Sequence, residues 1–100
     1  AATKGDDVCL LTGLTEIQKD DEIQWLFRDT EQETVIAKIK EGIKRTRDVP
    51  NGIFKDSLEL ESQTGNLIIR NSGLQHSGCY KLKIRSSKGD TNKTYFVTIR

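Results

Sequence analysis

The side chains able to make or break covalent bonds are few: one histidine, His76, and two cysteines, Cys9 and Cys79. Nucleophilic catalysis needs a base held against a serine or cysteine and oriented by a third group. His76 lies in a Ser- and Gly-containing turn with no carboxylate near it in sequence, and the chain has neither a Gly-rich phosphate loop nor an HExxH pair. The sequence therefore predicts that the protein is not an enzyme.

The two cysteines leave three arrangements open: one disulfide, two free thiols, or a bond to another chain. Zinc binding is disfavoured because one histidine and no CxxC pair would leave the metal dependent on carboxylates at no recognisable spacing. We therefore expect no metal and no cofactor.

Length and charge narrow the classes of protein further. One hundred residues suit one domain spanning 1–100. Sixteen Lys and Arg against fifteen Asp and Glu leave a net charge of +1, so no overall field favours nucleic acid or an anionic membrane. No stretch approaches the roughly 20 apolar residues of a membrane span, and no apolar signal-peptide core opens the chain. We expect no nucleic-acid partner and no direct membrane insertion by this fragment, which is either a soluble protein or a mature ectodomain cut from something longer.

Alternating apolar and polar residues predict short, half-buried strands along the whole chain. Clusters at 62–66 and 86–90 predict hairpin turns, and the charged stretch 16–22 predicts a solvated loop. The pattern favours an all-β sandwich of about eight or nine strands in two antiparallel sheets. The expected strands include 8–12, 23–27, 35–39, a strand at Phe54, 58–60, 67–69, 80–84 and 95–99.

Two motifs resemble those of immunoglobulin domains. The run Ser77–Leu82 is similar to the corner before strand F, where a tyrosine, here Tyr80, buries its ring while its hydroxyl bonds the corner backbone. The run Ile23-Gln24-Trp25 is similar to the strand that carries the core tryptophan. Tyr80 lies 55 positions after Trp25, which leaves room for the two extra strands of the variable type. The resemblance implies a V-set sandwich with Greek-key topology.

A departure from this pattern indicates a family. Thr12 and Leu82 stand where such domains carry their inter-sheet cysteines, so we expect the usual disulfide to be absent. In lacking this disulfide, and in the sequences of segments 20–25, 36–40 and 64–69, the chain resembles the N-terminal domain of the signalling lymphocyte activation molecule family. This family includes the T-cell adhesion receptor. The sequence of residues 13–21 is most similar to that of fish members of the family.

The alternation also bears on the reactive side chains. It turns Cys9 and Cys79 outward from opposite sheets, which stack about 10 Å apart, whereas bridged Cα atoms lie within about 7 Å. Free thiols are therefore favoured over an intradomain bridge or a bond to another chain. His76 stands where the corner motif has an aspartate, and no arginine opens the Phe54 strand, so a V-set Arg–Asp bridge is not expected. We interpret His76 as a partly exposed corner residue, with pH sensing as the alternative.

The resemblance implies a cell-surface recognition module on the extracellular side of the plasma membrane. Such a module would bind another immunoglobulin-like domain, itself or a relative, through the face called GFCC′. Leu26 and Phe96 would form an apolar anchor within a basic rim, unless they are ordinary exposed side chains. A bulge could change the facing of Lys38 and Lys40. The outward residues expected on this face are Gln24, Leu26, Arg28, Lys38, Lys40, Lys81, Lys83, Arg85, Phe96 and Thr98.

Acidic residues at 20–22 and 29–33 are expected in loops, where a two-fold homodimer could set them against the basic stripe of its neighbour. Asn92-Lys93-Thr94 fits the N-glycosylation pattern near the tip of the last hairpin. The main alternative is an intracellular, muscle-type immunoglobulin domain, although the long interval from Trp25 to Tyr80 counts against it. A lectin-like or lipid-binding V-set receptor is a further alternative without a specific motif.

Overall fold

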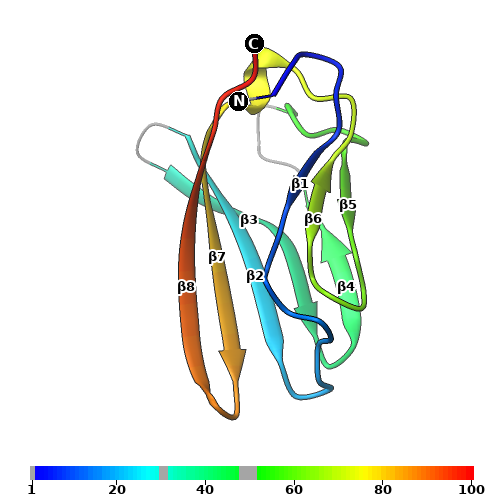
Figure 1. Cartoon of the computed structure of the whole chain (residues 1–100), viewed down its shortest axis with the longest axis vertical. Coiled ribbons are helices and arrows are strands. Elements are labelled where there is room, and N and C mark those ends of the chain that lie inside the picture. Colours follow the sequence, from blue (N-terminus) through cyan, green and yellow to red (C-terminus); the bar gives the residue numbers. More distant parts are fainter. Residues whose placement is uncertain (1, 30–31, 48–51) are drawn as a thin grey trace.

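The computed structural model describes residues 2–29, 32–47 and 52–100, which form two antiparallel sheets packed face to face (Figure 1). The smaller sheet has the order β1 (Val8–Leu10), β6 (Leu67–Ile69), β5 (Leu58–Leu60). The larger sheet has the order β4 (Ile43–Thr46), β3 (Gln32–Lys40), β2 (Glu22–Asp29), β7 (Gly78–Ser86), β8 (Gly89–Val97). A short 3-10 turn, η1 (Leu74–His76), precedes β7. The predicted all-β sandwich is confirmed.

The two chain ends and the β7–β8 turn lie at opposite ends of the sandwich. The N-terminal segment pairs in parallel with the C-terminal one at Ala2 and Ile99, so both ends of the chain meet at one end of the sandwich (Figure 1). The β7–β8 turn lies at the opposite end (Figure 1).

Period-two alternation places the apolar side chains of β2 and β7 between the sheets. Ile23, Trp25 and Phe27 are buried there together with Tyr80 and Leu82. Burial of each such side chain contributes about 1.5–3 kcal/mol, so these residues supply much of the free energy of folding. The core residues predicted from the alternation are confirmed.

Strand boundaries differ from the sequence pattern in several places, and the last strand, β8, begins at Gly89 instead of Tyr95. The first strand ends at Leu10, because Thr12 turns its backbone N–H toward the Asn66 side chain, at 2.9 Å. Phe54 was expected in a strand, but it lies in a series of turns and is buried as part of the core. Turn residues that bury an aromatic ring cannot be recognised by alternation.

The V-set resemblance left room for an extra strand after β3, but alternation did not locate β4, because its sequence is mostly basic. Strand β4 follows a two-residue turn in which Glu41 and Gly42 have positive φ values of 53° and 78°, the signs of a type I′ turn. This turn returns the chain directly onto β3, with Lys38 opposite Arg45 and Lys40 opposite Ile43. The larger sheet therefore gains a free edge strand.

Hydrogen bonds stand where the inter-sheet disulfide of other immunoglobulin domains would be. The Thr12 hydroxyl, almost fully buried, donates to the Thr64 carbonyl at 2.7 Å. The Trp25 indole N–H donates to the Gly65 carbonyl at 2.8 Å. These bonds tie the segment after β1 and strand β2 to the β5–β6 turn, and the predicted absence of the disulfide is confirmed.

Both cysteines are free thiols and lie on opposite sheets, as the alternation indicated. Cys9 is exposed on β1, and partial burial together with the nearby Glu61 charge raises the pKa of its thiol. Cys79 is half-buried on β7, between Arg28 and Phe96 in the strand register.

The corner before β7 holds the predicted tyrosine and a buried histidine. The Tyr80 hydroxyl donates to the His76 carbonyl at 2.5 Å, and burial raises the pKa of Tyr80 well above its usual value. The expectation that His76 is partly exposed is wrong, because only 1% of it is accessible. Its ring stacks on Phe54 with centroids 5.0 Å apart.

The partners of His76 determine its protonation. The Gly73 amide donates to Nδ1 at 3.0 Å, while Nε2 lies 2.6 Å from the Ile53 carbonyl oxygen, which can only accept. The ring must therefore be the neutral tautomer with its proton on Nε2. His76 thus occupies the position of the corner motif's aspartate, and there it bonds two backbone groups as a neutral ring instead of forming a salt bridge.

Candidate binding face on the larger sheet

The side of the larger sheet that is turned away from the core carries the side chains that alternate with the buried residues, and we call this side the outer face. Its facing is fixed by the pairing of β2 with β3 and β7, in which Gln24 lies opposite both Lys38 and Lys83. Its members are Glu22, Gln24, Leu26, Arg28, Glu33, Val35, Lys38, Lys40, Ile43, Arg45, Cys79, Lys81, Lys83, Arg85, Asp90, Asn92, Thr94 and Phe96.

A β-bulge determines which side chains of β3 reach this face. Trp25 pairs with Ala37 and Leu26 pairs with Val35, so Ile36 is the extra residue on β3. Ile36 and Ala37 are consequently both buried. Alternation resumes after the bulge, so Lys38 and Lys40 face outward as expected.

Leu26 was expected to be an exposed anchor, but it is only 7% accessible. It points outward between Val35 of β3 and Lys81 of β7. Lys81 reaches across β2 to Glu33, with its Nζ 2.5 Å from Oε1, and this ion pair spans the strand that carries Leu26. Alternation gives the direction of a side chain, but it does not show whether long neighbouring side chains cover it.

Phe96 is the exposed aromatic residue of this face, with 84% of its surface accessible. It lies opposite Cys79, which in turn lies opposite Arg28, so an aromatic ring, a thiol and a cation form one row across β8, β7 and β2. Thr98 was expected beside it but lies beyond the end of β8, where its carbonyl accepts the Ala2 N–H at 2.9 Å. Thr98 is exposed, and its place on the face stays a prediction.

The acidic residues are placed differently from the expectation. Glu22 and Glu33 lie in β2 and β3, not in loops, and both are on the outer face. Glu22 pairs with Lys38 at 3.3 Å, as Glu33 does with Lys81. Asp29 ends β2, and residues 30–31 of the second acidic stretch lie outside the described residues. Two carboxylates that were expected to serve a neighbouring copy therefore neutralise cations of their own face.

These ion pairs shift the acid titration of both carboxylates. The hydrogen bond from Lys81 lowers the pKa of Glu33, with smaller contributions from the charges of Lys81, Arg28 and Lys83 against a desolvation effect that raises it. For Glu22 desolvation raises the pKa, but Lys38 and the charges of Lys40 and Arg85 together outweigh it, and the pKa is lowered.

The remaining cations of the face lack such partners. In the part of the chain that the structure describes, no carboxylate lies within ion-pair distance of Arg28, Lys40, Lys83 or Arg85. Asp90 is the third carboxylate on the outer face, and it forms no ion pair with Arg85, opposite which it stands. The outer face is therefore positive, although the whole chain is almost neutral.

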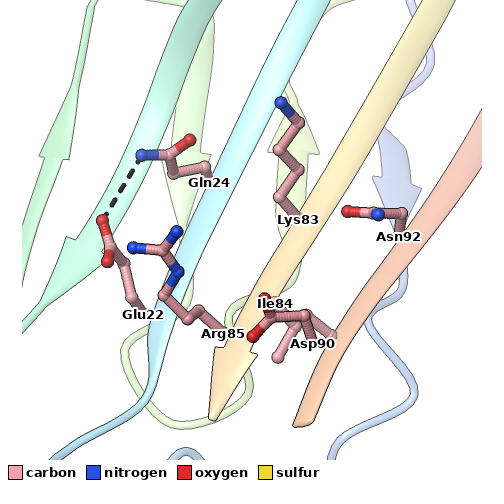
Figure 2. A pocket seen from close by; sticks show the side chains of 7 residues that line it. All are labelled: Glu22, Gln24, Lys83, Ile84, Arg85, Asp90 and Asn92. Carbon is pink, nitrogen blue, oxygen red and sulfur yellow. Dashed lines mark hydrogen bonds between the residues drawn. The ribbon is translucent and has the colours of Figure 1, made fainter.

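A shallow hollow at the β7–β8 turn end of the face collects polar side chains. Figure 2 shows Gln24 bonded to Glu22, with the Arg85 guanidinium turned toward them and Lys83 extending away along the face. The Gln24 amide donates to Glu22 at 3.3 Å. The lining residues are Glu22, Gln24, Lys83, Ile84, Arg85, Asp90 and Asn92.

Asn92 is one of these lining residues, and it was expected near the hairpin tip. It lies within β8 opposite Lys83 and is exposed. A glycan attached there would rise from the outer face itself. Sequence reasoning missed Ile43 and Arg45, which β4 adds to the other edge of this face. The Glu41-Gly42 pair between alternating residues was the signal that could have revealed them.

Comparisons with known proteins agree with this geometry. No family model matches the chain. SLAM family member 5 of Mus musculus is 31% identical over 97 residues, which cover 95% of this chain and 28% of that protein. This chain is an immunoglobulin V-type domain similar to that SLAM family member. The expected family resemblance is thus confirmed, while the closeness to fish members stays a prediction.

Solved structures show the same V-type fold. The human B7-H4 IgV-like domain has a TM-score of 0.77 at 24% identity, covering 98% of this chain and 89% of that one. The extracellular portion of mouse CD200RLa has a TM-score of 0.74 at 14% identity, covering 98% and 52%. Murine CRIg has a TM-score of 0.68 at 12% identity, covering 99% and 87%. These identities establish the fold alone.

The comparisons also bear on function class. The V-type domain spans little more than a quarter of its SLAM relative. The similar proteins are immunoglobulin-type receptor domains, so this domain belongs to a non-enzymatic class. Among the described residues, no helix is long and apolar enough to cross a membrane, and no group of three acidic, His or Cys side chains is placed to hold a metal ion.

Proposed function

We propose that this domain is the recognition module of a cell-surface immune-type receptor, which binds another immunoglobulin-like domain through the outer face. The observation that carries the proposal is Phe96, an almost fully exposed ring in one row with Cys79 and with Arg28, which forms no ion pair with the carboxylates that the structure describes. The similarity to SLAM family member 5 supports a place on the extracellular side of the plasma membrane. Nothing in the described residues favours the intracellular alternative over this one.

Phe96 and the surrounding cations would contribute in different ways. Burial of a phenylalanine ring in a partner's pocket is worth about 1.5–3 kcal/mol, which makes it a candidate hot spot. Exposed cations add less to affinity, but they orient the approach and raise the association rate. The partner that fits this face therefore has an apolar pocket within an acidic rim.

The charge of the face bears on whether the partner is a second copy. In a two-fold contact the same surface meets itself. Because Glu22 and Glu33 already pair with Lys38 and Lys81, the carboxylates left to neutralise a second copy are few. We infer that a related domain with an acidic face is preferred over a homodimer.

The test uses the domain as a fluorescent tetramer on cells that each display one full-length SLAM-type receptor. Phe96→Ala is expected to weaken binding at least tenfold, and Arg28→Gln to weaken it less while reducing its salt dependence. Leu74→Ala is the matched control, because Leu74 is also exposed, at 60%, but lies on η1, which is not a strand of the outer face. Equal binding by the Phe96 and Leu74 variants would refute the assignment of the face.

Self-association is tested separately by sedimentation at low and high salt. We expect a monomer in both, since like charges would meet across a two-fold contact. A dimer that dissociates in high salt and is lost in the Phe96→Ala variant would instead support homophilic binding.

We also propose that Asn92 carries an N-linked glycan when the domain is secreted. Asn92 is exposed on an edge strand, and Thr94, the third residue of its acceptor triplet, faces the same side opposite Lys81. Thr94→Ala should remove the glycan from protein secreted by animal cells, while Thr94→Ser should keep it, as read by intact mass. A glycan there would confine partner contact to the Phe96 end. A wild-type mass without glycan would refute this part of the proposal.

A further inference from the structure

The β3–β4 hairpin has a large excess of positive over negative side chains. Between residues 38 and 47 the sequence has five cations and one carboxylate, Glu41, while the whole chain has a net charge of only +1. β4 is the free edge of the larger sheet, and all four of its residues are exposed. The basic hairpin, as we call residues 38–47, is therefore a concentrated and accessible positive patch. Its cations are Lys38, Lys40, Lys44, Arg45 and Arg47.

The strand register distributes these cations around the free edge. Lys38 lies opposite Arg45 and Lys40 opposite Ile43, all on the outer face, where they line a shallow hollow at the Glu41 turn. Lys44 lies opposite the buried Ile39 and so points to the other side of β4, where its Nζ donates to the Leu60 carbonyl at 3.2 Å. The positive charge thus covers both sides of one strand edge.

Few of these cations are neutralised within the molecule. Lys38 pairs with Glu22, but within residues 2–29, 32–47 and 52–100 no carboxylate lies at ion-pair distance from Lys40, Lys44, Arg45 or Arg47. Like charges gathered at one edge repel each other and destabilise the folded state slightly. An anionic ligand would remove that repulsion.

We propose that the basic hairpin binds a linear sulfated polysaccharide of the heparan sulfate type. A thin polyanion can follow a strand edge and reach cations on both sides of it, whereas the flat face of a folded protein reaches one side. The guanidinium groups of Arg45 and Arg47 suit sulfate, because each can donate two parallel hydrogen bonds to its oxygens. A free strand edge also leaves alternate backbone N–H groups unpaired and able to donate.

Other polyanions fit the hairpin less well. Single-stranded nucleic acids are held by aromatic side chains that stack on bases, and the segment 38–47 has none. An anionic bilayer would favour several apolar side chains beside the cations, and this hairpin exposes only Ile43 as a large apolar residue among those described. Polysaccharide sulfates require only the positive charge and donors that the hairpin provides.

The polysaccharide site does not depend on the receptor-binding proposal. The two surfaces share Lys38, Lys40, Ile43 and Arg45, so the variant that separates them is Phe96→Ala, whose residue lies on β8, outside the basic hairpin. Phe96→Ala, which should impair partner binding, should leave polysaccharide binding unchanged. Failure of one proposal is therefore distinguishable from failure of the other.

The experiment measures affinity of the folded domain for immobilised heparin over a range of salt concentrations. Arg45→Gln/Arg47→Gln is expected to weaken binding about tenfold near 0.15 M salt and to make the dependence on salt less steep. Lys19→Gln/Lys88→Gln removes the same charge from exposed turn positions elsewhere and should change affinity less than twofold. Thermal unfolding of each variant checks that the fold is retained.

Three results would overturn the proposal. One is absence of heparin binding by the wild type near physiological salt. Another is an equal loss in the Arg45/Arg47 and Lys19/Lys88 variants, which would indicate attraction to net charge alone. The third is binding to polyglutamate, single-stranded DNA or phosphatidylserine vesicles as tight as binding to heparin, which would assign the hairpin to another class of anion.

Discussion

At the corner before β7, each ring lies against another ring and each polar atom has a partner, whereas the outer face leaves an aromatic ring and several cations open to solvent. In the corner, Phe54 stacks on His76. Its ring also meets those of Phe27 and Tyr80 edge to face, with ring centroids 5.0 and 6.1 Å apart. On the outer face, Phe96 has 84% of its surface accessible. The corner therefore stabilises the fold, and the face is available for binding.

The difference has a physical cause. A buried donor or acceptor that loses its partner costs about 1–3 kcal/mol, so a sequence that buries His76 must also supply Gly73 and Ile53. No such requirement acts on an exposed cation, whose neutralisation is worth about 0–1 kcal/mol. Substitutions should therefore affect stability at the corner and recognition at the face.

Among the corner residues, the largest effect is expected for His76→Ala. It removes a stacked ring and leaves the Gly73 amide and the Ile53 carbonyl without their partner, so we expect a loss of about 3 kcal/mol in the free energy of unfolding. Urea denaturation followed by Trp25 fluorescence measures it. Leu74→Ala, on the same 3-10 turn but exposed, is the control and should change stability by less than about 0.5 kcal/mol. Similar losses in the two variants would erase the contrast between buried corner and open surface.

Tyr80→Phe should have the second effect in size. It keeps the buried ring but removes the hydroxyl that donates to the His76 carbonyl at 2.5 Å. We expect a loss of about 1–2 kcal/mol, because the carbonyl is left unsatisfied in the core. Tyr95→Phe is the matched control, since its hydroxyl bonds the exposed Leu11 carbonyl and water can replace it. A smaller loss for Tyr80→Phe than for Tyr95→Phe would contradict the importance of the corner bond.

The sequence predicted the fold better than the surface. Trp25 and Tyr80 were assignable because alternation and motif spacing both indicated them, and Thr12 and Leu82 showed that the disulfide was missing. His76 is buried against Phe54, which lies 22 residues away in a turn. Leu26 is shielded by long side chains, since the ion pair of Lys81 on β7 with Glu33 on β3 spans the strand that carries it. Both outcomes arise from tertiary neighbours, which local patterns do not contain.

The ion pairs of the outer face should produce a small effect that depends on pH. The pKa values of Glu22 and Glu33 in the folded domain are lowered from the ordinary 4.5, so their contribution to stability is fully present above that value and is lost as pH falls through the lowered ones. Glu22→Gln/Glu33→Gln should therefore flatten the decline of stability below pH 4.5, while stability near pH 7 changes little. Urea denaturation from pH 3 to 7 measures this. An unchanged acid decline in the double variant would show that these pairs are not linked to folding.

The smallest effect on stability is expected where the effect on recognition is largest. Phe96→Ala removes a ring that is mostly in water in the free domain, so the free energy of unfolding should change by less than about 0.5 kcal/mol. Phe27→Ala, which removes a buried ring of the same type from the inner side of the sheet, should cost about 3–5 kcal/mol. An outer-face phenylalanine that stabilised the isolated domain as strongly as Phe27 would have to be packed against the protein itself. Its exposure would then no longer support a binding role, so the two unfolding curves test the observation on which the proposed function depends.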